Sequence, residues 1–311
     1  MDRRSMRIFA TGWSEGYDGP GRRWVVYLKG CNLNCRWCAN PEGIETEPQM
    51  LFRPGRAAQP DVACPEGAVT EHAGGWRLSR ERCVTCRERR CIQVWRHPAF
   101  EWVGEDVSPS EIVRRVLKAR GLFGTEGGVT FGGGEPTLQI EEVLEAVRLL
   151  RREAIHVAVE SNAATETFAS IPGEVDLLIC DLKCATSELH REWTGLGNER
   201  VLWNLRQAVQ VQPRMTLRIP LIPGFNDSPE EMSRIGDFLS ELSSLRRERA
   251  QRGGWDPVRV EILRLHHLGE PKYAALDWEY PMVGVAVPDR ERAESLAAIL
   301  QERGHEARVL L

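Results

Sequence analysis

Three cysteines stand close together in a spacing that suits an iron-sulfur cluster. Cys31, Cys35 and Cys38 occur in the segment GCNLNCRWC. Three thiolates on one short loop can hold three irons of a 4Fe-4S cube and leave the fourth iron open to a small molecule. A structural zinc site and thiols buried simply as small apolar groups are the alternatives. Zinc sites usually carry paired C-x2-C knuckles with a fourth Cys or His nearby, which is a different spacing.

A glycine-rich segment further along the chain has the residue types of a ligand-binding turn. Gly132, Gly133 and Gly134 are followed by Glu135 and a proline, directly after an apolar run. Glycines let the backbone approach a ligand closely, and a carboxylate beside them can accept a hydrogen bond from an ammonium group. The segment follows the next strand after the cysteine loop, so we expect the two to lie close together.

Six aliphatic, β-branched runs predict the strands that must position these groups. They have the composition of strands buried on both faces, and helical patterns lie between them. The runs are 24–28, 129–131, 156–160, 175–180, 216–221 and 258–263. Because parallel strands need right-handed crossovers, the predicted fold is α/β, a partial (β/α)6 TIM-type barrel. Its reactive residues should lie at the carboxyl ends of the strands.

Two of the intervening helices carry a clear start signal. The segments SPSE at 108–111 and SPEE at 228–231 each place a serine at the N-cap, a proline at the first position and a glutamate at the third. Further helices are predicted at 141–152, 200–210 and 290–303. Helices therefore follow or precede the predicted strands as a barrel requires.

One segment, 45–107, interrupts this alternation. It has little apolar periodicity, while Pro, Gly, Arg and four cysteines accumulate in it. A segment so small and so poor in core residues needs a cross-link to hold its fold together, and a metal bound by its cysteines is the one available. We therefore expect a partial barrel formed by residues 1–44 and 108–311, with a small ferredoxin-like, cluster-binding insert at 45–107.

The cysteines of the insert resemble the ligand set of one ferredoxin cluster. Bacterial two-cluster ferredoxins carry two C-x2-C-x2-C-x3-C-P runs, and the fourth Cys of each run ligates the other cluster. Cys64, which precedes Pro65, matches the last ligand of a first run, and Cys83, Cys86 and Cys91 match the first three of a second. These four would hold one auxiliary 4Fe-4S cluster. The x4 spacing between the last two departs from the ferredoxin pattern, so a zinc site or unmetallated thiols remain alternatives.

Composition narrows the class of protein. The chain of 311 residues is 42% hydrophobic and 28% charged, with a formal net charge of -4. These values are typical of a soluble globular protein, and they suggest neither nucleic acid nor a membrane surface as a partner. No apolar run has the length of a signal h-region or a bilayer span. Nine cysteines, an odd count without a secretory signal, indicate reduced thiols or metal ligands in a cytoplasmic protein.

Taken together, these motifs resemble the radical S-adenosylmethionine (SAM) superfamily. A C-x3-C-x2-C loop after a strand resembles that superfamily's signature, and GGEP at 133–136 resembles the motif that holds the methionine end of SAM. The segment YDGPGR at 17–22 resembles the DGPG-R motif of the glycyl-radical-enzyme activating enzymes, the group typified by pyruvate formate-lyase activating enzyme. Further segments similar to that family are NPE at 40–42, DLK at 181–183, PGFND at 223–227 and LHHLGEPKY at 265–273.

The resemblance implies roles for individual residues. The implied catalytic residues are Lys183 and the three loop cysteines, whose cluster would chelate the amino and carboxylate groups of SAM. Lys183 would pair with that carboxylate and His266 would bond the ribose, although a salt-bridged strand end and an ordinary loop histidine are the alternatives. The implied cofactor contacts are Trp37, Gly133, Gly134, Glu135, Glu160, Ser161, Asp181, Lys183 and His266.

Two further sites follow from the same resemblance. Glu160, Ser161, the backbone at Ile179 and the carboxylate of Asp181 resemble a monovalent-cation site beside SAM, and oxygen ligands suit such a hard ion. Asp18, on the loop ahead of the first strand, would contact the glycine loop of a partner protein. Cys180 and Cys184 receive no role.

The function implied is that of a radical SAM oxidoreductase that activates a glycyl radical enzyme. One electron from the reduced cluster would cleave SAM to methionine and a 5'-deoxyadenosyl radical, which would remove hydrogen from a glycine of the partner. A flavodoxin- or ferredoxin-type protein would supply the electron under anaerobic conditions. The alternatives are a radical SAM enzyme acting on another peptide or small molecule, and a non-catalytic electron-transfer or zinc-binding protein.

Overall fold

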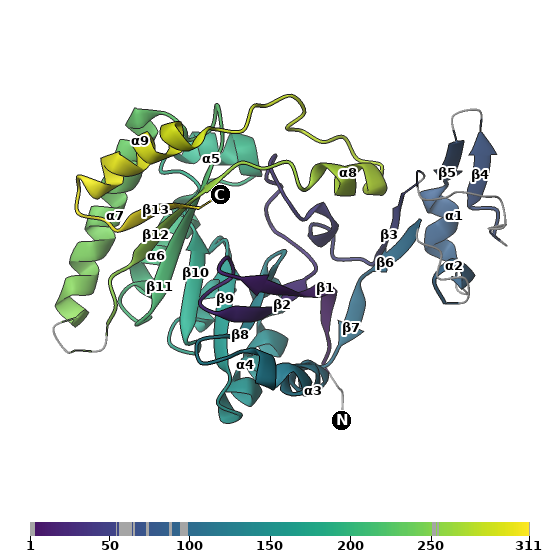
Figure 1. The fold of residues 1–311 in the computed structure, drawn as a ribbon, viewed down its shortest axis with the longest axis horizontal. Coiled ribbons are helices and arrows are strands. Elements are labelled where there is room, and N and C mark those ends of the chain that lie inside the picture. Colours follow the sequence, from purple (N-terminus) through teal and green to yellow (C-terminus); the bar gives the residue numbers. More distant parts are fainter. Residues whose placement is uncertain are drawn as a thin grey trace.

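The computed structural model describes residues 4–53, 55, 64, 66–72, 75–86, 89–93, 99–250, 253 and 255–310. Within these ranges the main feature is a nine-stranded sheet with the strand order β13-β12-β11-β10-β9-β8-β2-β1-β7. Figure 1 shows this sheet with helices beside it and a smaller group of elements projecting to one side. The cysteine loop and the glycine-rich turn both belong to connections at the end of its strands.

The six strands predicted from the sequence form one continuous parallel block. They are β2 (Arg22–Leu28), β8 (Gly128–Gly133), β9 (His156–Ser161), β10 (Leu177–Asp181), β11 (Met215–Leu221) and β12 (Arg259–Arg264). Each pairs in parallel with its neighbour in this order. The prediction of an α/β fold with a mostly parallel, partial-barrel sheet is therefore confirmed.

Alternate positions of these strands face two different environments. Val157 and Val159 of β9, and Leu217 and Ile219 of β11, belong to the main hydrophobic core between the sheet and its helices. The positions between them project to the opposite face, because successive side chains of a strand alternate. These positions are buried as well, along most of β8, β10 and β11, so the expectation of strands buried on both faces is confirmed. The inner face is partly polar, because it carries Arg218 and Glu261 beside the apolar Ala158 and Ile179.

Three strands of the sheet were not predicted. They are β1 (Met6–Glu15), which runs antiparallel to β2, β7 (Glu105–Val107), which runs antiparallel to β1, and β13 (Ala307–Leu310), which runs parallel to β12. The two edge strands of the sheet are β13 and β7, and β1, next to β7, is buried at only a few of its positions. An edge strand with one exposed face lacks the continuous apolar run on which the prediction relied.

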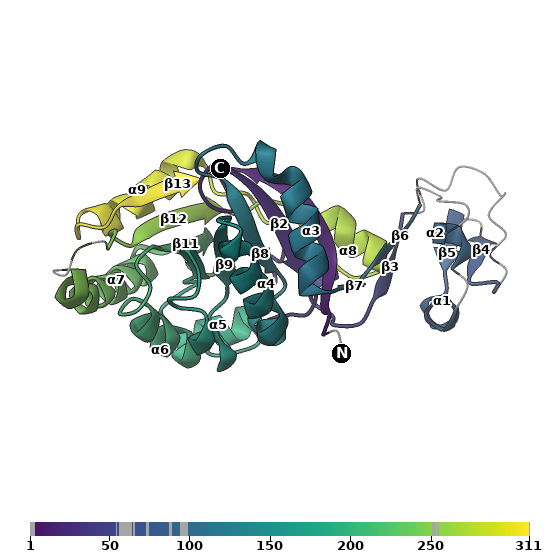
Figure 2. The same ribbon diagram turned by 90° about the horizontal axis from the view of Figure 1, so that it is seen from below.

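The helices pack mainly on the outer face of the curved sheet, as Figure 2 shows from below. Those predicted from the sequence are α3 (Pro109–Ala119), α4 (Ile140–Arg152), α6 (Glu199–Ala208), α7 (Pro229–Ala250) and α9 (Arg290–Gln301). Both capping signals are confirmed: the hydroxyl of Ser108 accepts from the Glu111 N–H at 3.3 Å, and that of Ser228 accepts from the Glu231 N–H at 3.1 Å. Not predicted were α5 (Ser187–Thr194), α8 (Glu270–Leu276) and the 3-10 turns η1 (Pro41–Gly43), η3 (Arg120–Leu122), η4 (Pro136–Gln139) and η5 (Thr167–Ser170).

The segment between β2 and α3 contains the small projecting group of elements at the right of Figure 1. Strand β3 (Gln49–Phe52) pairs antiparallel with β6 (Phe100–Val103), and β4 (Val69–His72) pairs antiparallel with β5 (Gly75–Leu78). Two short helices follow, α1 (Arg80–Thr85) and α2 (Arg90–Gln93). Its last strand, β7, hydrogen-bonds to β1 in the main sheet, so the segment both leaves and rejoins the barrel through strands. The exact domain boundaries stay a prediction.

None of the helices in the described ranges combines the length and the hydrophobicity that a bilayer-spanning segment needs.

Candidate active site

A cavity of about 360 Å³ opens at the carboxyl ends of the parallel strands. The ends of β8 to β12 and the cysteine loop after β2 form its walls. Most of the site residues predicted from the sequence line it: Asp18, Cys31, Cys35, Trp37, Cys38, Gly133, Gly134, Glu160, Ser161, Asp181, Lys183 and His266. Parallel strands thus bring together residues that are far apart in the chain. Glu135 and the cysteines of the insert do not line this cavity.

The cysteine loop is fixed at both ends by backbone hydrogen bonds. The Cys31 N–H donates to the Ile44 carbonyl at 2.9 Å, and the Asn34 N–H donates to the Thr194 carbonyl, at the end of α5, at 2.8 Å. The Cys38 N–H donates to the Cys35 carbonyl at 3.0 Å, which closes the last turn of the loop. The three thiols therefore have a fixed place on one wall of the cavity.

The chemistry of these thiols suits an iron-sulfur cluster. Burial raises the pKa of Cys31, Cys35 and Cys38 to about 12, so the thiols are protonated at neutral pH unless a cation replaces the protons. Within the described residues, no three His, Cys, Asp or Glu side chains converge to the distances of a single bound ion. A cube takes each thiolate on a different iron, and three thiols around one open cavity leave room for a ligand on the fourth.

The glycine-rich turn packs against the base of the cysteine loop. The Gly134 N–H donates to the Leu28 carbonyl and the Glu135 N–H to the Gly30 carbonyl, each at 2.7 Å. A Cβ at Gly134 would lie 2.1 Å from the Gly30 carbonyl oxygen, and Gly133 has a φ of +108°. The glycines are required by this contact between strand ends as well as by the cavity that they line.

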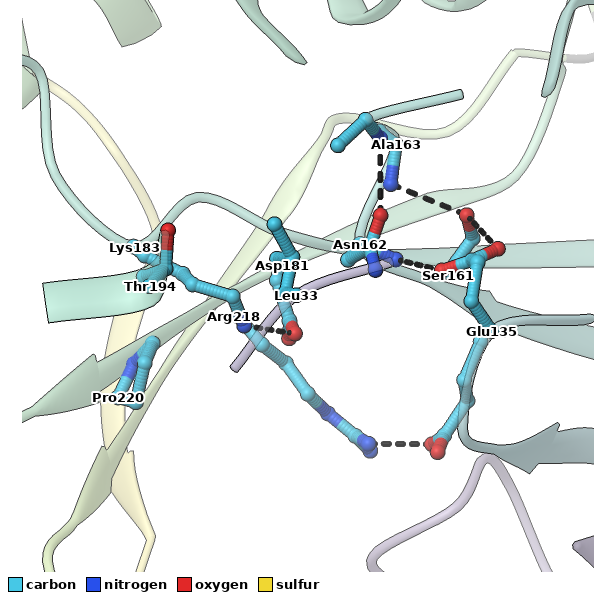
Figure 3. A network of polar contacts seen from close by, with 12 residues as sticks. Leu33, Glu135, Ser161, Asn162, Ala163, Asp181, Lys183, Thr194, Arg218 and Pro220 are labelled. Atoms are coloured by element: carbon cyan, nitrogen blue, oxygen red, sulfur yellow. Dashed lines mark hydrogen bonds and ion pairs between the residues drawn. The ribbon is translucent and has the colours of Figure 1, made fainter. Parts of the chain in front are cut away.

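Glu135 supports the site from beneath and does not line the cavity. Its carboxylate is fully buried and accepts hydrogen bonds from the Thr137 N–H (3.1 Å), the Thr137 hydroxyl (2.7 Å), the Ser161 hydroxyl (2.8 Å) and the Asn162 N–H (2.7 Å). Burial raises its pKa and these donors oppose that rise. As Figure 3 shows, the side chain joins the end of β8 to the end of β9. This geometry disfavours the predicted contact between Glu135 and the ammonium group of SAM.

Lys183 forms a fixed positive charge on another wall. Its ammonium donates to Asp181 Oδ2 at 2.5 Å, and its side chain is only 7% exposed. Burial lowers the pKa of Lys183, but the charge of Asp181 and the hydrogen bond to it help to outweigh this effect and hold the pKa above its ordinary value. The ammonium lies 5.9 Å from the ring centroid of Trp37. A permanent cation beside the cysteine loop is suited to binding a carboxylate.

His266 and its neighbour have different surroundings. The Leu268 N–H donates to His266 Nδ1 at 3.4 Å, and burial lowers the pKa of this imidazole. The ring is therefore neutral with its proton on Nε2, which is left to donate to a hydroxyl group. His267 contacts the Tyr280 hydroxyl at 3.0 Å and the Val285 carbonyl at 2.9 Å, so both of its ring nitrogens are engaged within the loop.

Asp18 lies on the loop between β1 and β2 and lines this cavity. Its carbonyl accepts from the Thr130 hydroxyl at 2.6 Å, and Arg23 Nε donates to the same hydroxyl at 3.0 Å. A second cavity of about 540 Å³ begins next to this loop, at Gly19 and Gly21, and extends along the inner face of the sheet.

The oxygens predicted to bind a monovalent cation already have partners. The Glu160 carboxylate forms an ion pair with Arg218, and Asp181 pairs with Lys183. The Ser161 hydroxyl donates to Glu135. As the chain folds them, both carboxylates of this set are paired with fixed positive side chains, which disfavours a further cation at this place. Arg218, which sequence analysis did not identify, occupies this place.

The four cysteines of the insert meet in a separate, largely apolar pocket. Cys64, Cys83, Cys86 and Cys91 line it together with Met50, Ala68, Val69, Leu78, Arg89 and Phe100. Burial and the neighbouring thiols raise the pKa of Cys83 to about 11. The two remaining cysteines, Cys180 and Cys184, are buried in hydrophobic clusters of the barrel.

Comparison with known proteins identifies the family. The model of the radical SAM superfamily matches residues 25–235. The chain belongs to this superfamily. It is 30% identical over 303 residues to the 4-hydroxyphenylacetate decarboxylase activating enzyme of Clostridioides difficile, which covers 93% of this chain and 90% of that protein. It is 33% identical over 281 residues to the (2S)-3-sulfopropanediol sulfolyase activating enzyme of Bilophila wadsworthia, with 86% and 88% covered.

These relatives also define the enzyme class. The chain is a radical SAM enzyme of the glycyl-radical-enzyme activating family, and the resemblance found in its sequence is confirmed. Among solved structures, a radical SAM methyltransferase from Sphaerobacter thermophilus has the same fold, with a TM-score of 0.55 at 19% identity over 97% of this chain and 69% of that one. Membership of the superfamily implies a 4Fe-4S cluster and SAM as cofactors.

Proposed function

We propose that this enzyme activates a glycyl radical enzyme by reductive cleavage of SAM. One observation carries the proposal: a single cavity is lined both by three thiols of one loop and by the fixed cation of Lys183. The thiols suit a cluster with one open iron, and the ammonium group suits the carboxylate of a ligand on that iron. The names of the relatives support a protein partner as the target, since each is an activating enzyme of another enzyme.

The chain's own residues would bind and orient the reactants. When bound, the cluster supplies the electron that cleaves SAM into methionine and a 5'-deoxyadenosyl radical. Lys183 would hold the carboxylate of SAM, the Nε2 proton of His266 would bond its ribose, and Trp37 would cover the cysteine loop. Cysteine ligation and these contacts fix the reacting group in one orientation, which is the main contribution that a protein makes to radical chemistry.

The partner's glycine would approach from the side of Asp18. This residue lines the SAM cavity, on the loop that precedes β2. An extended loop of the partner could pass Asp18 into the SAM cavity and present a glycine Cα–H to the radical. Transfer of that hydrogen atom forms 5'-deoxyadenosine and leaves the unpaired electron on the glycine.

We extend the proposal to one auxiliary 4Fe-4S cluster in the insert, residues 45–107. The support is that Cys64, Cys83, Cys86 and Cys91 line one apolar pocket despite their irregular spacing. Four thiols would close the coordination of a cube, so this cluster would carry electrons and not bind a substrate. A flavodoxin- or ferredoxin-type donor in the cytoplasm would supply them. A monovalent cation is left out of the proposal, because its predicted oxygens have other partners.

The proposal is tested first by SAM cleavage and then by activation. Anaerobically reconstituted enzyme and its Cys35→Ala variant are given SAM and a strong reductant, and 5'-deoxyadenosine is measured. The glycyl radical enzyme encoded nearest to this chain in its genome is then added, and the glycyl radical is sought by electron paramagnetic resonance (EPR). We expect product from the parent alone, followed by a glycine-centred signal on the partner. Failure of the parent to form 5'-deoxyadenosine would contradict the radical SAM mechanism.

The EPR assay with the partner distinguishes a glycyl radical enzyme from other possible substrates. Ample 5'-deoxyadenosine without a glycyl radical on that protein, or on the other glycyl radical enzymes of the same genome, would favour another peptide or a small molecule as the substrate. Substitution of the partner's reactive glycine by alanine provides the matched control, because it should remove the signal and leave SAM cleavage in place.

A further inference from the structure

Arg218 is a charged side chain in the interior of the barrel, on the floor of the SAM cavity. It lies on β11, and its side chain is only 10% exposed. With Ile179 it lines both the SAM cavity and the larger cavity beside the DGPG loop, so these two residues separate the cavities. Figure 3 shows the guanidinium group extending toward a carboxylate, away from the Lys183–Asp181 pair.

The register of the sheet explains this position. Arg218 is opposite Asp181 on β10 and opposite Glu261 on β12. Its guanidinium forms an ion pair with Glu160, which lies on β9, one strand beyond β10, and its Nε donates to Glu261 at 3.0 Å. One arginine therefore joins carboxylates from strands on either side of its own.

These carboxylates need a positive partner. A buried carboxylate is unfavourable unless a charge or several donors compensate it. Burial raises the pKa of Glu160, and the Arg218 guanidinium is the first influence that opposes this rise. Arg308, on β13, also pairs with Glu261 but is largely exposed. Arg218 is therefore the interior cation of this group, and a guanidinium stays charged at all relevant pH values.

The same arrangement places two fixed positive side chains where a small cation would have to bind. Arg218 already bonds one oxygen of Glu160, and Lys183 bonds one oxygen of Asp181. A bound Na⁺ or K⁺ at these oxygens would lie between two fixed positive side chains and would be repelled by both. The glutamate at position 160 makes the ion pair with Arg218 possible, because its side chain reaches the guanidinium across an intervening strand.

We infer that Arg218 replaces a monovalent cation at the floor of the SAM cavity, so that SAM binding needs no added Na⁺ or K⁺. The inference rests on the proposed function only in that SAM is taken to occupy this cavity. It assigns Arg218 a positioning role: the guanidinium holds the end of β9, and with it Glu160, in the place where the cavity wall requires it.

The test measures SAM binding in buffers that differ only in their cation. Reduced, cluster-reconstituted enzyme is titrated with SAM in potassium, sodium or choline buffer of equal ionic strength, and the change in the EPR spectrum of the cluster reports binding. We expect the dissociation constants of the parent to agree within about twofold in all three buffers, since choline is too large for such a site. A dissociation constant raised fivefold or more in choline would overturn the inference.

Variants of Arg218 make the test specific. In Arg218→Met the carboxylates lose their partner, and we expect SAM binding at least about tenfold weaker in choline and largely restored by potassium. Arg218→Lys retains a charge and should stay independent of the buffer cation. Arg206→Met, which removes an arginine from an ion pair with Glu241 between α6 and α7, is the matched control and should behave as the parent does.

The outcomes separate this inference from the proposed function. Binding of SAM by the parent only in the presence of potassium or sodium overturns the inference and leaves the proposed function standing. No spectral response to SAM in any buffer overturns both. If Arg218→Met does not fold, the parent and Arg218→Lys decide the question, because cation-independent binding by both supports the inference and cation dependence in the parent contradicts it.

Discussion

The two groups of thiols in this enzyme have opposite surroundings. Around Cys31, Cys35 and Cys38 the walls carry an ammonium group, a neutral imidazole and carboxylates, and the cavity is open. Around the four insert cysteines the lining is mainly apolar, and the pocket is small. Polar walls around an incomplete ligand set suit a centre that binds a reactant, whereas an apolar shell around a complete set suits a centre that only exchanges electrons. The surroundings therefore distinguish the two sites more clearly than the number of cysteines does.

Single cysteine substitutions should show the largest difference between the two groups of thiols. We expect Cys35→Ala to lower the rate of 5'-deoxyadenosine formation by on the order of a thousandfold, because SAM would lose the open iron that binds it. Cys86→Ala should retain cleavage within about tenfold when a chemical reductant replaces the natural donor, since the insert would only carry electrons. Anaerobic product assays on both reconstituted variants measure the difference.

Iron analysis provides the control for that experiment. The parent should bind about eight irons per chain and each variant about four, if each group of thiols holds one cube. Equal loss of SAM cleavage in both variants, with the remaining cluster intact, would contradict the division of roles between the two sites.

Glu135 provides a second test, which measures how much the polar surroundings of the SAM cavity contribute to the stability of the fold. Glu135→Gln replaces a buried acceptor of four hydrogen bonds by an amide whose NH2 group would face donors. We expect the free energy of unfolding to fall by about 3 kcal/mol, with weaker SAM binding as the end of β9 shifts. The matched control is Glu101→Gln on β6, whose pair with Arg53 is exposed and should contribute less than about 1 kcal/mol. Urea unfolding of the two variants with reconstituted clusters tests this, and equal losses would show that Glu135 is not a special support.

The contact between the insert and the barrel gives a third, smaller effect. Arg80, at the start of α1, donates to the Met50 carbonyl of β3 at 2.8 Å and to the Ala275 carbonyl of α8 at 2.9 Å. Arg80→Met should weaken the docking of α1 on α8 by about 2 kcal/mol, because both bonds involve a charged donor. Hydrogen exchange should then become faster in α1 and α8 and remain unchanged in β9 and β10.

A control for this docking contact lies nearby in the insert. Among the described residues, Arg82 on the same helix donates to the Gly67 carbonyl of the insert, at 3.2 Å, and to no carbonyl of α8. Arg82→Met should leave the exchange rates of α8 unchanged. If both variants loosen α8 equally, the effect does not come from the contact made by Arg80.

Much of the fold and of the cavity could be predicted from the sequence because local signals were unambiguous. Apolar runs identified the six parallel strands, and the serine caps of α3 and α7 placed two helix starts. The carboxyl-end rule for parallel strands then correctly grouped Lys183 and His266 with the cysteine loop in one cavity. Their proposed roles still await experiment.

What the sequence could not provide is the pairing of charges across strands. Arg218 stands in the run TLRIP and Glu160 ends the run VAVE, and neither pattern says which residue the other meets. That depends on the register of β9, β10 and β11, which is decided by the whole sheet. The same limit explains Glu135, because its partners Ser161 and Asn162 come from a different strand end. The alternation of charged and apolar residues within β9 and β11 was the signal that could have revealed a polar inner face.

The smallest expected effect is a pH dependence of the unfolding free energy that arises at the amino ends of the strands, opposite the SAM cavity. His156, at the start of β9, accepts a bond from Arg23 Nη1 at 3.0 Å through Nδ1, since a guanidinium can only donate. Burial and the charge of Arg23 lower the pKa of His156, Arg214 lowers it further, and Asp176 partly offsets them. Below the ordinary histidine pKa of about 6.5, the unfolded chain binds a proton that the folded chain resists.

Stability should therefore fall as the pH drops below about 6.5, by about 1 kcal/mol or less from this residue. His156→Gln keeps an acceptor for Arg23 but cannot titrate, so its unfolding free energy should decline less steeply between about pH 7 and 5.5 than that of the parent. Urea unfolding at several pH values compares the two slopes. Equal slopes would mean that His156 titrates normally in the folded enzyme. A shallower slope, with SAM binding unchanged at pH 7, would show that this end of the barrel governs acid stability while the opposite end carries the chemistry.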